Sequence, residues 1–204
     1  MPDHRQLRKE ILAARNAQSA EEIHQKSEAI CDRLLAMPEI TNCSSILLYV
    51  HIRSEVETTR LLDYLLEHGK TVSVPITYLE GPRLDAIQIT DPEKDLAPGC
   101  YGILEPRQEI LADNLIDPRT IEVILLPGSV FDLRCGRFGY GGGFYDRFVA
   151  AAPQALRIGM AFDLQVVERA PLQPHDELLD MVVTESRIIH GTREVQQETP
   201  APKF

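Results

Sequence analysis

The chain has 204 residues, 44% of them hydrophobic and 25% charged. This is the make-up of an ordinary globular protein with one large domain or two small ones, and with a core that needs no disulfide or metal support. The formal net charge of −10, without a long run of one sign, argues against a general nucleic-acid or anionic-membrane surface but leaves a small anionic ligand open.

The N-terminal 40 residues predict two helices. Residues 3–17 place apolar side chains at helical spacing, which is typical of an amphipathic helix. Ser19 and Glu22 have the spacing of a capping box, so a second helix should follow and end before Pro38, because the residue before a proline avoids the helical region. The simplest role of the basic residues in the first helix is a solvated face, although their number in an acidic protein also fits anion binding. They are Arg5, Arg8, Lys9 and Arg15.

From residue 45 onward, short apolar runs alternate with helical patterns, which predicts one α/β domain with a mostly parallel sheet. The expected strands cover residues 45–52, 71–76, 83–89, 121–126, 156–162 and 181–184, and the expected helices cover residues 58–68 and 145–152. We expect the domain to span residues 1–190 and the polar residues 191–204 to form a flexible tail.

Gly69 belongs to a helix stop, although Gly69-Lys70-Thr71 has the last three residues of a phosphate-binding P-loop. A P-loop would need a glycine where Tyr64 stands and a helix after the lysine, whereas a strand is expected there.

The sequence predicts neither a targeting segment nor a cysteine-based site. No apolar run is long enough to span a membrane, and residues 1–11 contain no apolar stretch of a secretory signal. The four cysteines form no C-x-x-C pair, so neither zinc nor a disulfide framework is expected. We expect reduced, buried thiols in a cytoplasmic protein; the cysteines are Cys31, Cys43, Cys100 and Cys135.

The strongest signal for chemistry is the glycine-rich segment 126–147, LPGSVFDLRCGRFGYGGGFYDR. It follows the most hydrophobic strand, and ligands bind beyond the C-terminal ends of strands in open α/β sheets. Glycines let the backbone N–H groups approach a phosphate, and the flanking Arg137 and Arg147 match phosphate geometry. Asp146 could hold Mg²⁺, which prefers oxygen ligands. The alternative is a glycine bend that serves only packing.

Two other acidic segments are candidates for function. Glu57, at the start of a helix, suits the helix dipole, whereas Glu55 lies nearer the strand end and leaves a ligand role open. His175-Asp176 follows a proline-rich turn, where acid–base or metal chemistry competes with the commoner turn or capping role.

Taken in order, these segments resemble the 5-formyltetrahydrofolate cyclo-ligase family, also called methenyltetrahydrofolate synthetase. The resemblance extends from about Leu7 to Thr184, and its most specific part is the glycine-rich segment ending in Tyr145-Asp146-Arg147. The motifs that carry it are Leu7-Arg8-Lys9, Glu55-Val56-Glu57-Thr58, Gly102-Ile103-Leu104-Glu105-Pro106, Pro127-Gly128-x-x-Phe131-Asp132, residues 136–147, and Gln165 with His175-Asp176.

The resemblance implies a single three-layer α/β/α domain, similar to ribose-5-phosphate isomerase and CoA-transferase folds. It implies ATP-dependent cyclisation of 5-formyltetrahydrofolate to 5,10-methenyltetrahydrofolate, with Mg²⁺ and with release of ADP and phosphate. The ATP γ-phosphoryl group would go to the formyl oxygen, and N10 would then close the ring. Such chemistry needs positioning and charge neutralisation rather than a side-chain nucleophile. The expected partners are these small molecules, with no nucleic acid or membrane, and the expected state is a monomer, with a dimer left open.

The resemblance also implies roles for individual residues. The catalytic residues would be Arg137 and Tyr145, and the metal ligands Asp146 and Asp176. ATP would contact His4, Arg5, Arg8, Arg137, Phe138, Gly139, Tyr140, Gly141, Gly142, Gly143, Phe144 and Tyr145. The folate would contact Val50, Glu55, Tyr101, Tyr140, Gly141, Gly142, Gly143 and Phe144.

The sequence departs from the family pattern at two places. The family usually has a lysine where His4 stands, so His4 or the neighbouring Arg5 would take its role. Some relatives have basic residues at the positions of Tyr140 and Gly142, so phosphate contacts here should rest more on backbone N–H groups. Two other functions stay open, a non-catalytic protein that sequesters 5-formylfolate and a sugar-phosphate enzyme of similar fold.

Overall fold

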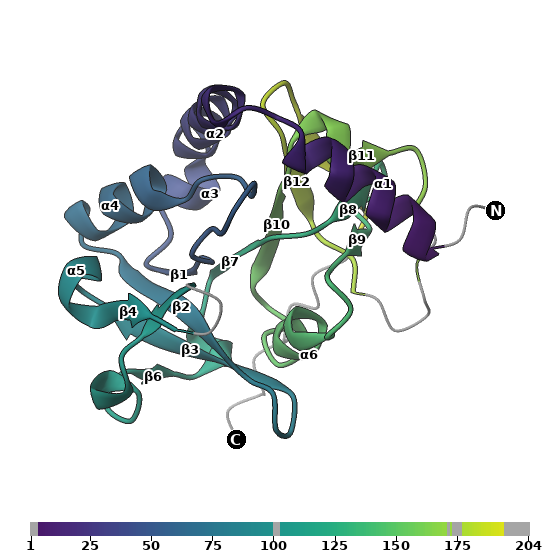
Figure 1. Cartoon of the computed structure of the whole chain (residues 1–204). Helices are drawn as coiled ribbons and strands as arrows, with labels where there is room; N and C mark the ends of the chain where they lie inside the picture. The colour runs from purple at the N-terminus through teal and green to yellow at the C-terminus, as the bar shows by residue number, and fades with distance from the viewer. Residues whose placement is uncertain (1–3, 100–102, 171, 173–176, 194–204) are drawn as a thin grey trace, which may run out of the picture.

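The computed structural model describes residues 4–99, 103–170, 172 and 177–193. Its centre is an eight-stranded sheet with the strand order β13-β12-β10-β7-β1-β2-β3-β6 (Figure 1). Strands β12, β10, β7, β1 and β2 run parallel, and antiparallel strands extend both edges, so the predicted mostly parallel sheet is confirmed. The strands are β1 (Ser45–Leu47), β2 (Thr71–Tyr78), β3 (Arg83–Ile89), β6 (Leu115–Ile116), β7 (Val123–Leu126), β10 (Leu156–Met160), β12 (Met181–Val183) and β13 (Ile188–His190).

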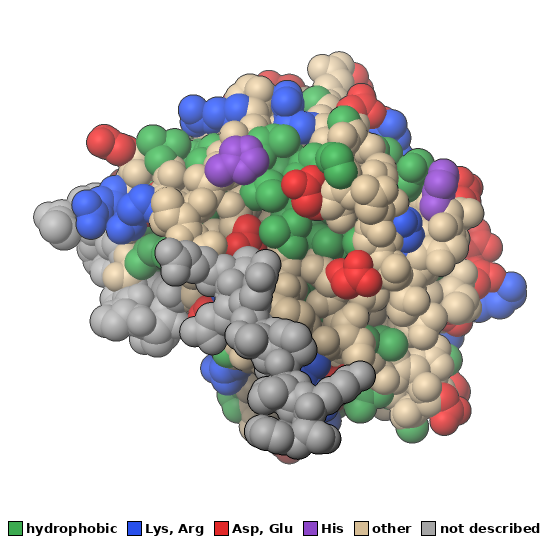
Figure 2. All heavy atoms as spheres, turned by 180° about the vertical axis from the view of Figure 1, so that it is seen from behind, with side chains coloured by type: hydrophobic (Ala, Val, Ile, Leu, Met, Phe, Trp, Pro, Cys, Tyr) green, Lys and Arg blue, Asp and Glu red, His purple; other side chains and the backbone are tan. Residues whose placement is uncertain are grey.

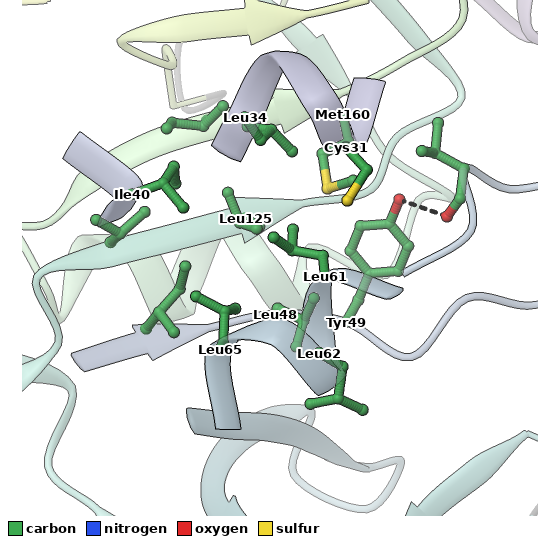
Figure 3. Close-up of a cluster of buried hydrophobic side chains, with 14 of the residues drawn as sticks. Cys31, Leu34, Ile40, Leu48, Tyr49, Leu61, Leu62, Leu65, Leu125 and Met160 are labelled. Atoms are coloured by element: carbon green, nitrogen blue, oxygen red, sulfur yellow. Dashed lines mark hydrogen bonds between the residues drawn. The ribbon is translucent and has the colours of Figure 1, made fainter. Parts of the chain in front are cut away.

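Helices cover both faces of this sheet, in the predicted three-layer arrangement (Figure 1). One face is covered by α2 (Ala20–Leu35), α3 (Pro38–Thr41) and α4 (Thr59–Glu67), and the other by α6 (Phe144–Ala150). Because successive strand residues point to opposite faces, Leu125 packs into the core beneath α2, α3 and α4 (Figure 3), whereas Leu126 packs into the core beside α6. Strand β7 is buried along its whole length, as its hydrophobicity predicts.

Smaller elements surround the central sheet. Helix α1 (His4–Asn16) lies beside a three-stranded sheet of β11 (Val166–Val167), β8 (Val130–Asp132) and β9 (Arg137–Phe138) (Figure 1). A two-stranded sheet pairs β4 (Leu96–Pro98) with β5 (Leu104–Pro106). The remaining short helices among the described residues are α5 (Pro92–Asp95), η2 (Gln108–Ile110), η3 (Pro118–Thr120) and η4 (Asp163–Gln165).

The predicted helix signals act as expected. The Ser19 hydroxyl accepts the Glu22 backbone N–H at 3.2 Å, and the Glu22 carboxylate accepts the Ser19 N–H at 2.8 Å, which completes the capping box of α2. Gly69, with φ of 68°, follows the end of α4 in the left-handed conformation. Lys70 Nζ donates to the carbonyl oxygens of Thr41 and Cys43. The Gly69-Lys70-Thr71 segment therefore has a structural role, as expected for a helix stop that is not a P-loop.

The predicted strand over residues 45–52 is too long, because β1 ends at Leu47. From Tyr49 the chain enters a compact turn in which the Tyr49 hydroxyl donates to the Val56 carbonyl oxygen at 3.1 Å (Figure 3). The backbone N–H of Thr58 donates to Nδ1 of His51 at 3.1 Å. The hydrophobicity of residues 49–52 therefore reflects packing in this turn and not strand pairing.

The surface and the thiols agree with an ordinary globular chain. On the face in Figure 2, Lys and Arg side chains are interspersed with Asp and Glu side chains among the described residues. Cys31, Cys43 and Cys135 are free and buried, and Cys100 lies outside the described residues. Within the described part of the chain, no helix is long and apolar enough to cross a membrane.

Candidate active site

The main cavity lies beyond the C-terminal ends of β1 and β7. The chain continues from β1 through α4 to β2 on one side, and from β7 through α6 to β10 on the other, so the strand order reverses between β1 and β7. Such a switch point is the usual ligand site of an open α/β sheet. The cavity has a volume of ≈ 730 Å³, which falls within the range of about 300–1,000 Å³ for small-molecule sites.

The glycine-rich segment after β7 is folded back by the β8–β9 hairpin, whose turn is held by Asp132. This carboxylate is fully buried and accepts the backbone N–H groups of Arg134, Gly136 and Ala170, each at 2.9 Å. The Arg134 guanidinium adds an ion pair at 2.6 Å. Burial opposes ionisation of Asp132, but the hydrogen bonds from Arg134 and these amides outweigh it and lower its pKa. Asp132 is thus a scaffold for the loop.

Gln165 fixes the start of the glycine-rich segment. Its side-chain amide donates to the carbonyl oxygens of Gly128 at 2.8 Å and Ser129 at 3.2 Å, and its oxygen accepts the Phe162 N–H at 3.0 Å. The glycine-rich loop therefore leaves the sheet from a rigid base.

The central glycines of the loop are required by its conformation. Gly141 has φ of 100° and Gly143 has φ of 63°, both in the left-handed region that residues with a Cβ atom rarely adopt. A Cβ atom at Gly142 would lie 2.5 Å from the Phe144 ring. The backbone angles by themselves would also fit a bend that serves only packing. However, the loop lines the cavity and exposes its backbone there at Gly141 and Gly142, which favours a role in ligand binding.

Arg137 lies beneath this loop with 4% of its surface exposed. It donates to the Pro127 carbonyl oxygen at 3.1 Å and to Asp146 Oδ1 at 2.8 Å, and it lies 5.5 Å from the centre of the Tyr145 ring. Burial, and next the negative charge of Glu55, raises the pKa of the Tyr145 hydroxyl, so this group keeps its proton and can donate a hydrogen bond.

Glu55 supplies a buried carboxylate to the same cavity, from the turn after β1. It is 5% exposed, accepts the backbone N–H of Ile52 at 3.2 Å and accepts the hydroxyl of Tyr140. Burial raises the pKa of Glu55, against the lowering effects of the Tyr140 hydrogen bond and the positive charge of Arg15. The ligand role that the sequence left open for Glu55 fits this position.

Arg8 reaches the cavity from α1 and stacks on Phe138, with its guanidinium carbon 4.5 Å from the ring centre. Its Nε is buried, and no acceptor among the described residues bonds it. A buried charged donor without an acceptor is costly, so this N–H is suited to a bound anion.

The sequence profile of the 5-formyltetrahydrofolate cyclo-ligase family matches residues 1–185. The chain belongs to this cyclo-ligase family. A mouse 5-formyltetrahydrofolate cyclo-ligase is 26% identical over 188 residues, which cover 89% of this chain and 93% of the relative. The Escherichia coli K12 cyclo-ligase is 25% identical over 180 residues, which cover 87% of this chain and 98% of the relative.

Solved structures agree with the family assignment. The NMR structure of Aquifex aeolicus 5,10-methenyltetrahydrofolate synthetase aligns with a TM-score of 0.80 and 30% identity, over 98% of this chain and 99% of that one. A Mycoplasma pneumoniae 5,10-methenyltetrahydrofolate synthetase, at 24% identity, shares the fold with a TM-score of 0.71 over 90% of this chain and 99% of that one.

In this member of the cyclo-ligase family, most residues expected at the site meet in one cavity. They are Arg8, Val50, Glu55, Arg137, Phe138, Gly139, Tyr140, Gly141, Gly142, Gly143, Phe144, Tyr145 and Asp146. Arg5 borders a neighbouring groove of ≈ 440 Å³ along α1, which Arg8 also lines. Tyr101, His175, Asp176 and the side chain of His4 lie outside the described residues, so their roles stay predictions.

The prediction that the basic residues of α1 form a solvated face is wrong for Arg15. It is buried among polar groups at the C-terminal end of the helix. The signal was present in the sequence, because Arg8, Ile11 and Arg15 are spaced i, i+3 and i+7 and therefore share one helix face.

Carboxylates available for a metal are few in the described part of the site. No group of three or more His, Cys, Asp or Glu side chains that could hold a metal is found among the described residues. The carboxylates in the described lining are Glu55, Glu105, Asp146 and Glu177. Asp146 is paired with Arg137 and Glu177 with Arg157. Mg²⁺ commonly binds through one or two carboxylates together with substrate phosphates, so this donor set fits an ion that arrives with a nucleotide.

Proposed function

We propose that this chain is an ATP-dependent 5-formyltetrahydrofolate cyclo-ligase, which forms 5,10-methenyltetrahydrofolate and releases ADP and phosphate. The observation that carries the proposal is a single cavity lined both by a buried carboxylate, Glu55, and by arginine and glycine residues. A carboxylate matches the donor-rich edge of a pterin ring. Arginines and backbone N–H groups match phosphates. The family match over residues 1–185 supports both assignments.

The reaction asks the protein for positioning and charge neutralisation. The formyl group is amide-like and therefore a poor electrophile, so its oxygen first takes the γ-phosphoryl group as the bond to ADP breaks. N10 then attacks the activated carbon and the five-membered ring closes. The carbon–oxygen bond breaks, N10 gives up its proton, and the released phosphate can carry that proton away. Arg137 and the loop N–H groups would neutralise the phosphoryl charge, and the protonated Tyr145 hydroxyl would donate a hydrogen bond.

Asp146, together with Asp176, would hold Mg²⁺ when the nucleotide is bound, and the ion would neutralise phosphate charge. We also infer that residues 1–190 form one catalytic domain of a cytoplasmic, monomeric enzyme, and the domain inference rests on the family match over residues 1–185. The predicted flexible tail begins too early, because the Gly191 N–H donates to the Asp180 carbonyl oxygen at 2.7 Å and Arg193 pairs with the Asp180 carboxylate at 2.8 Å. Residues 191–193 thus pack on the domain, and residues 194–204 lie outside the described residues.

The direct test is to mix the protein with Mg·ATP and 5-formyltetrahydrofolate and to follow the near-ultraviolet absorbance of the methenyl product. An ATP-dependent rise is expected. Folate binding by calorimetry without turnover would instead favour a sequestering protein. A melting temperature raised by ribose phosphate but not by folate would favour a sugar-phosphate enzyme.

Replacing Arg8 with alanine should raise the KM for ATP by about tenfold and leave the KM for folate nearly unchanged, because Arg8 offers its buried N–H to the phosphate side of the cavity. Lys94→Ala is the control, since Lys94 on α5 is exposed and lines neither the cavity nor the groove beside α1. Steady-state kinetics with each substrate varied will separate the two constants. An effect of Arg8→Ala confined to folate would contradict the assignment.

Glu55→Gln should raise the KM for folate by about tenfold or more, because the amide presents a donor where the ring needs an acceptor. Glu57→Gln, two residues away on the surface beside His24, is the control and should behave like the wild type.

Since the ionised form is the acceptor and the pKa of Glu55 is raised, wild-type folate affinity should fall as the pH drops through that raised value. A folate affinity that stays constant from neutral pH down through the ordinary range of a glutamate would argue against this role.

A further inference from the structure

The guanidinium of Arg15 is buried, and its described hydrogen bonds go to hydroxyl and carbonyl groups and not to a carboxylate. It is 5% exposed, and Nε donates to the Ser54 hydroxyl at 3.1 Å. Nη1 donates to the Tyr140 hydroxyl at 2.9 Å and, at 3.4 Å, to the carbonyl oxygen of Gly128. Its contacts thus join α1 to the turn after β1 and to two places in the glycine-rich segment, Gly128 near its start and Tyr140 in its central loop.

The Tyr140 hydroxyl links Arg15 to Glu55. A hydroxyl has one proton, and because the Tyr140 oxygen accepts from Arg15, that proton is free to be donated to Glu55 Oε1. About half of Tyr140 is exposed, but its hydroxyl lies at this inner end, between a cation and an anion. Hydrogen bonds with ionised partners are shorter and stronger than neutral ones, so the chain from Arg15 through Tyr140 to Glu55 should hold one arrangement.

Helix α1 therefore contacts two sides of the cavity with one face. Arg8 and Arg15 are seven residues apart, which is two helical turns and a rise of about 10 Å. Arg8 lies at the phosphate side beside Phe138, and Arg15 acts on the carboxylate side through Tyr140.

We propose that Arg15 is a positioning residue, which holds the Tyr140 hydroxyl against Glu55 so that the Glu55 carboxylate faces the folate ring in one orientation and stays charged. This inference rests on the proposed function, because it assigns Glu55 to the folate. It adds a residue that never touches the substrate, and it gives the polar network at the end of α1 a role in substrate binding.

The charges around Glu55 support this role. Arg15 from α1 and Arg53 from its own turn favour the ionised carboxylate, as does the hydrogen bond from Tyr140. Tyr49 and Tyr145, from the end of β1 and from α6, also face Glu55, but both have raised pKa values and stay neutral. Without Arg15, burial would act on Glu55 with less compensation, so its pKa should rise further.

The test compares Arg15→Met with the wild type in full-chain protein. We expect the KM for folate to rise about tenfold, the KM for ATP to change less than about twofold, and the acid limb of kcat/KM for folate to move up by about one pH unit. Arg15→Lys should restore the acid limb in part, because it keeps the charge. Arg33→Met is the control, since Arg33 on α2 anchors the carbonyl oxygens of Thr184 and Glu185 and should alter neither quantity.

Tyr140→Phe removes one hydroxyl and should fold even if Arg15→Met does not. It should produce the same shift of the acid limb, and the double variant should lose little more than either single one. Calorimetric binding of 5-formyltetrahydrofolate repeats the comparison without turnover. Unchanged folate affinity and pH dependence in Arg15→Met, or in Tyr140→Phe where the former is unfolded, would overturn the role of Arg15. A wild type that binds folate but never forms the methenyl product would overturn the proposed function instead.

Discussion

Replacing Arg137 with alanine should lower kcat by about 10²–10³-fold, the cost of removing one preorganised charged donor from a transition state. Arg137 is buried beneath the glycine-rich loop and already held by Pro127 and Asp146. Its charge therefore needs little reorganisation when negative charge develops on the transferred phosphoryl group. Pre-steady-state formation of the methenyl product is the measurement that isolates this step.

Two comparisons make the Arg137 result interpretable. Arg119→Ala removes an exposed arginine that is paired with Asp117 and lies outside the described cavity lining, so it should leave kcat unchanged. Arg137→Lys keeps the charge but loses the planar donor pair, so it should recover part of the activity. A kcat within twofold of the wild type for folded Arg137→Ala would remove Arg137 from the catalytic residues.

Asp132→Ala should lower the free energy of unfolding by about 3 kcal/mol, because it leaves buried backbone N–H groups without an acceptor and an arginine without its partner. Asp132 is fully buried and accepts from Gly136 and Ala170 as well as from Arg134. Denaturation in urea, with the midpoint and slope compared between variants, will measure the loss. Folate and ATP binding should weaken as well, since the loop loses its anchor.

The chain contains a matched control for this prediction. Asp117 and Arg119 form the same Asp-x-Arg pair at 2.6 Å, but both side chains are exposed, so Asp117→Ala should cost only a small part of the loss seen for Asp132→Ala. Equal losses for the two variants would mean that burial of Asp132 is not the cause.

The pH dependence of Asp132 follows from the sign of its pKa change. Its folded pKa is lowered, so its contribution to stability is present above the unfolded value of about 3.9. That contribution is lost as the pH falls through the lowered folded value. The difference in stability between the wild type and Asp132→Ala should therefore be constant near neutral pH and shrink below about pH 4.

Local features of the sequence predicted the main elements because their causes are local. The capping box at Ser19, the stop at Gly69 and the continuous apolar run of β7 each depend on neighbours within a few residues. The predictions were less accurate at strand ends, as at Leu47, because a strand ends where its pairing partner ends. Strands such as β9 and β11 are too short to carry a hydrophobic pattern.

The sequence by itself determined the family, the α/β class and the glycine-rich loop as the ligand-binding candidate, because ordered motifs and short-range patterns encode them. The tertiary structure alone decided which side chains work together. It places Glu55 against Tyr140, which lies 85 residues later, and buries Arg15 and Asp132 as anchors rather than surface charges. Hydrogen bonds between distant segments depend on how the sheet orders its strands, and no short sequence window contains that order.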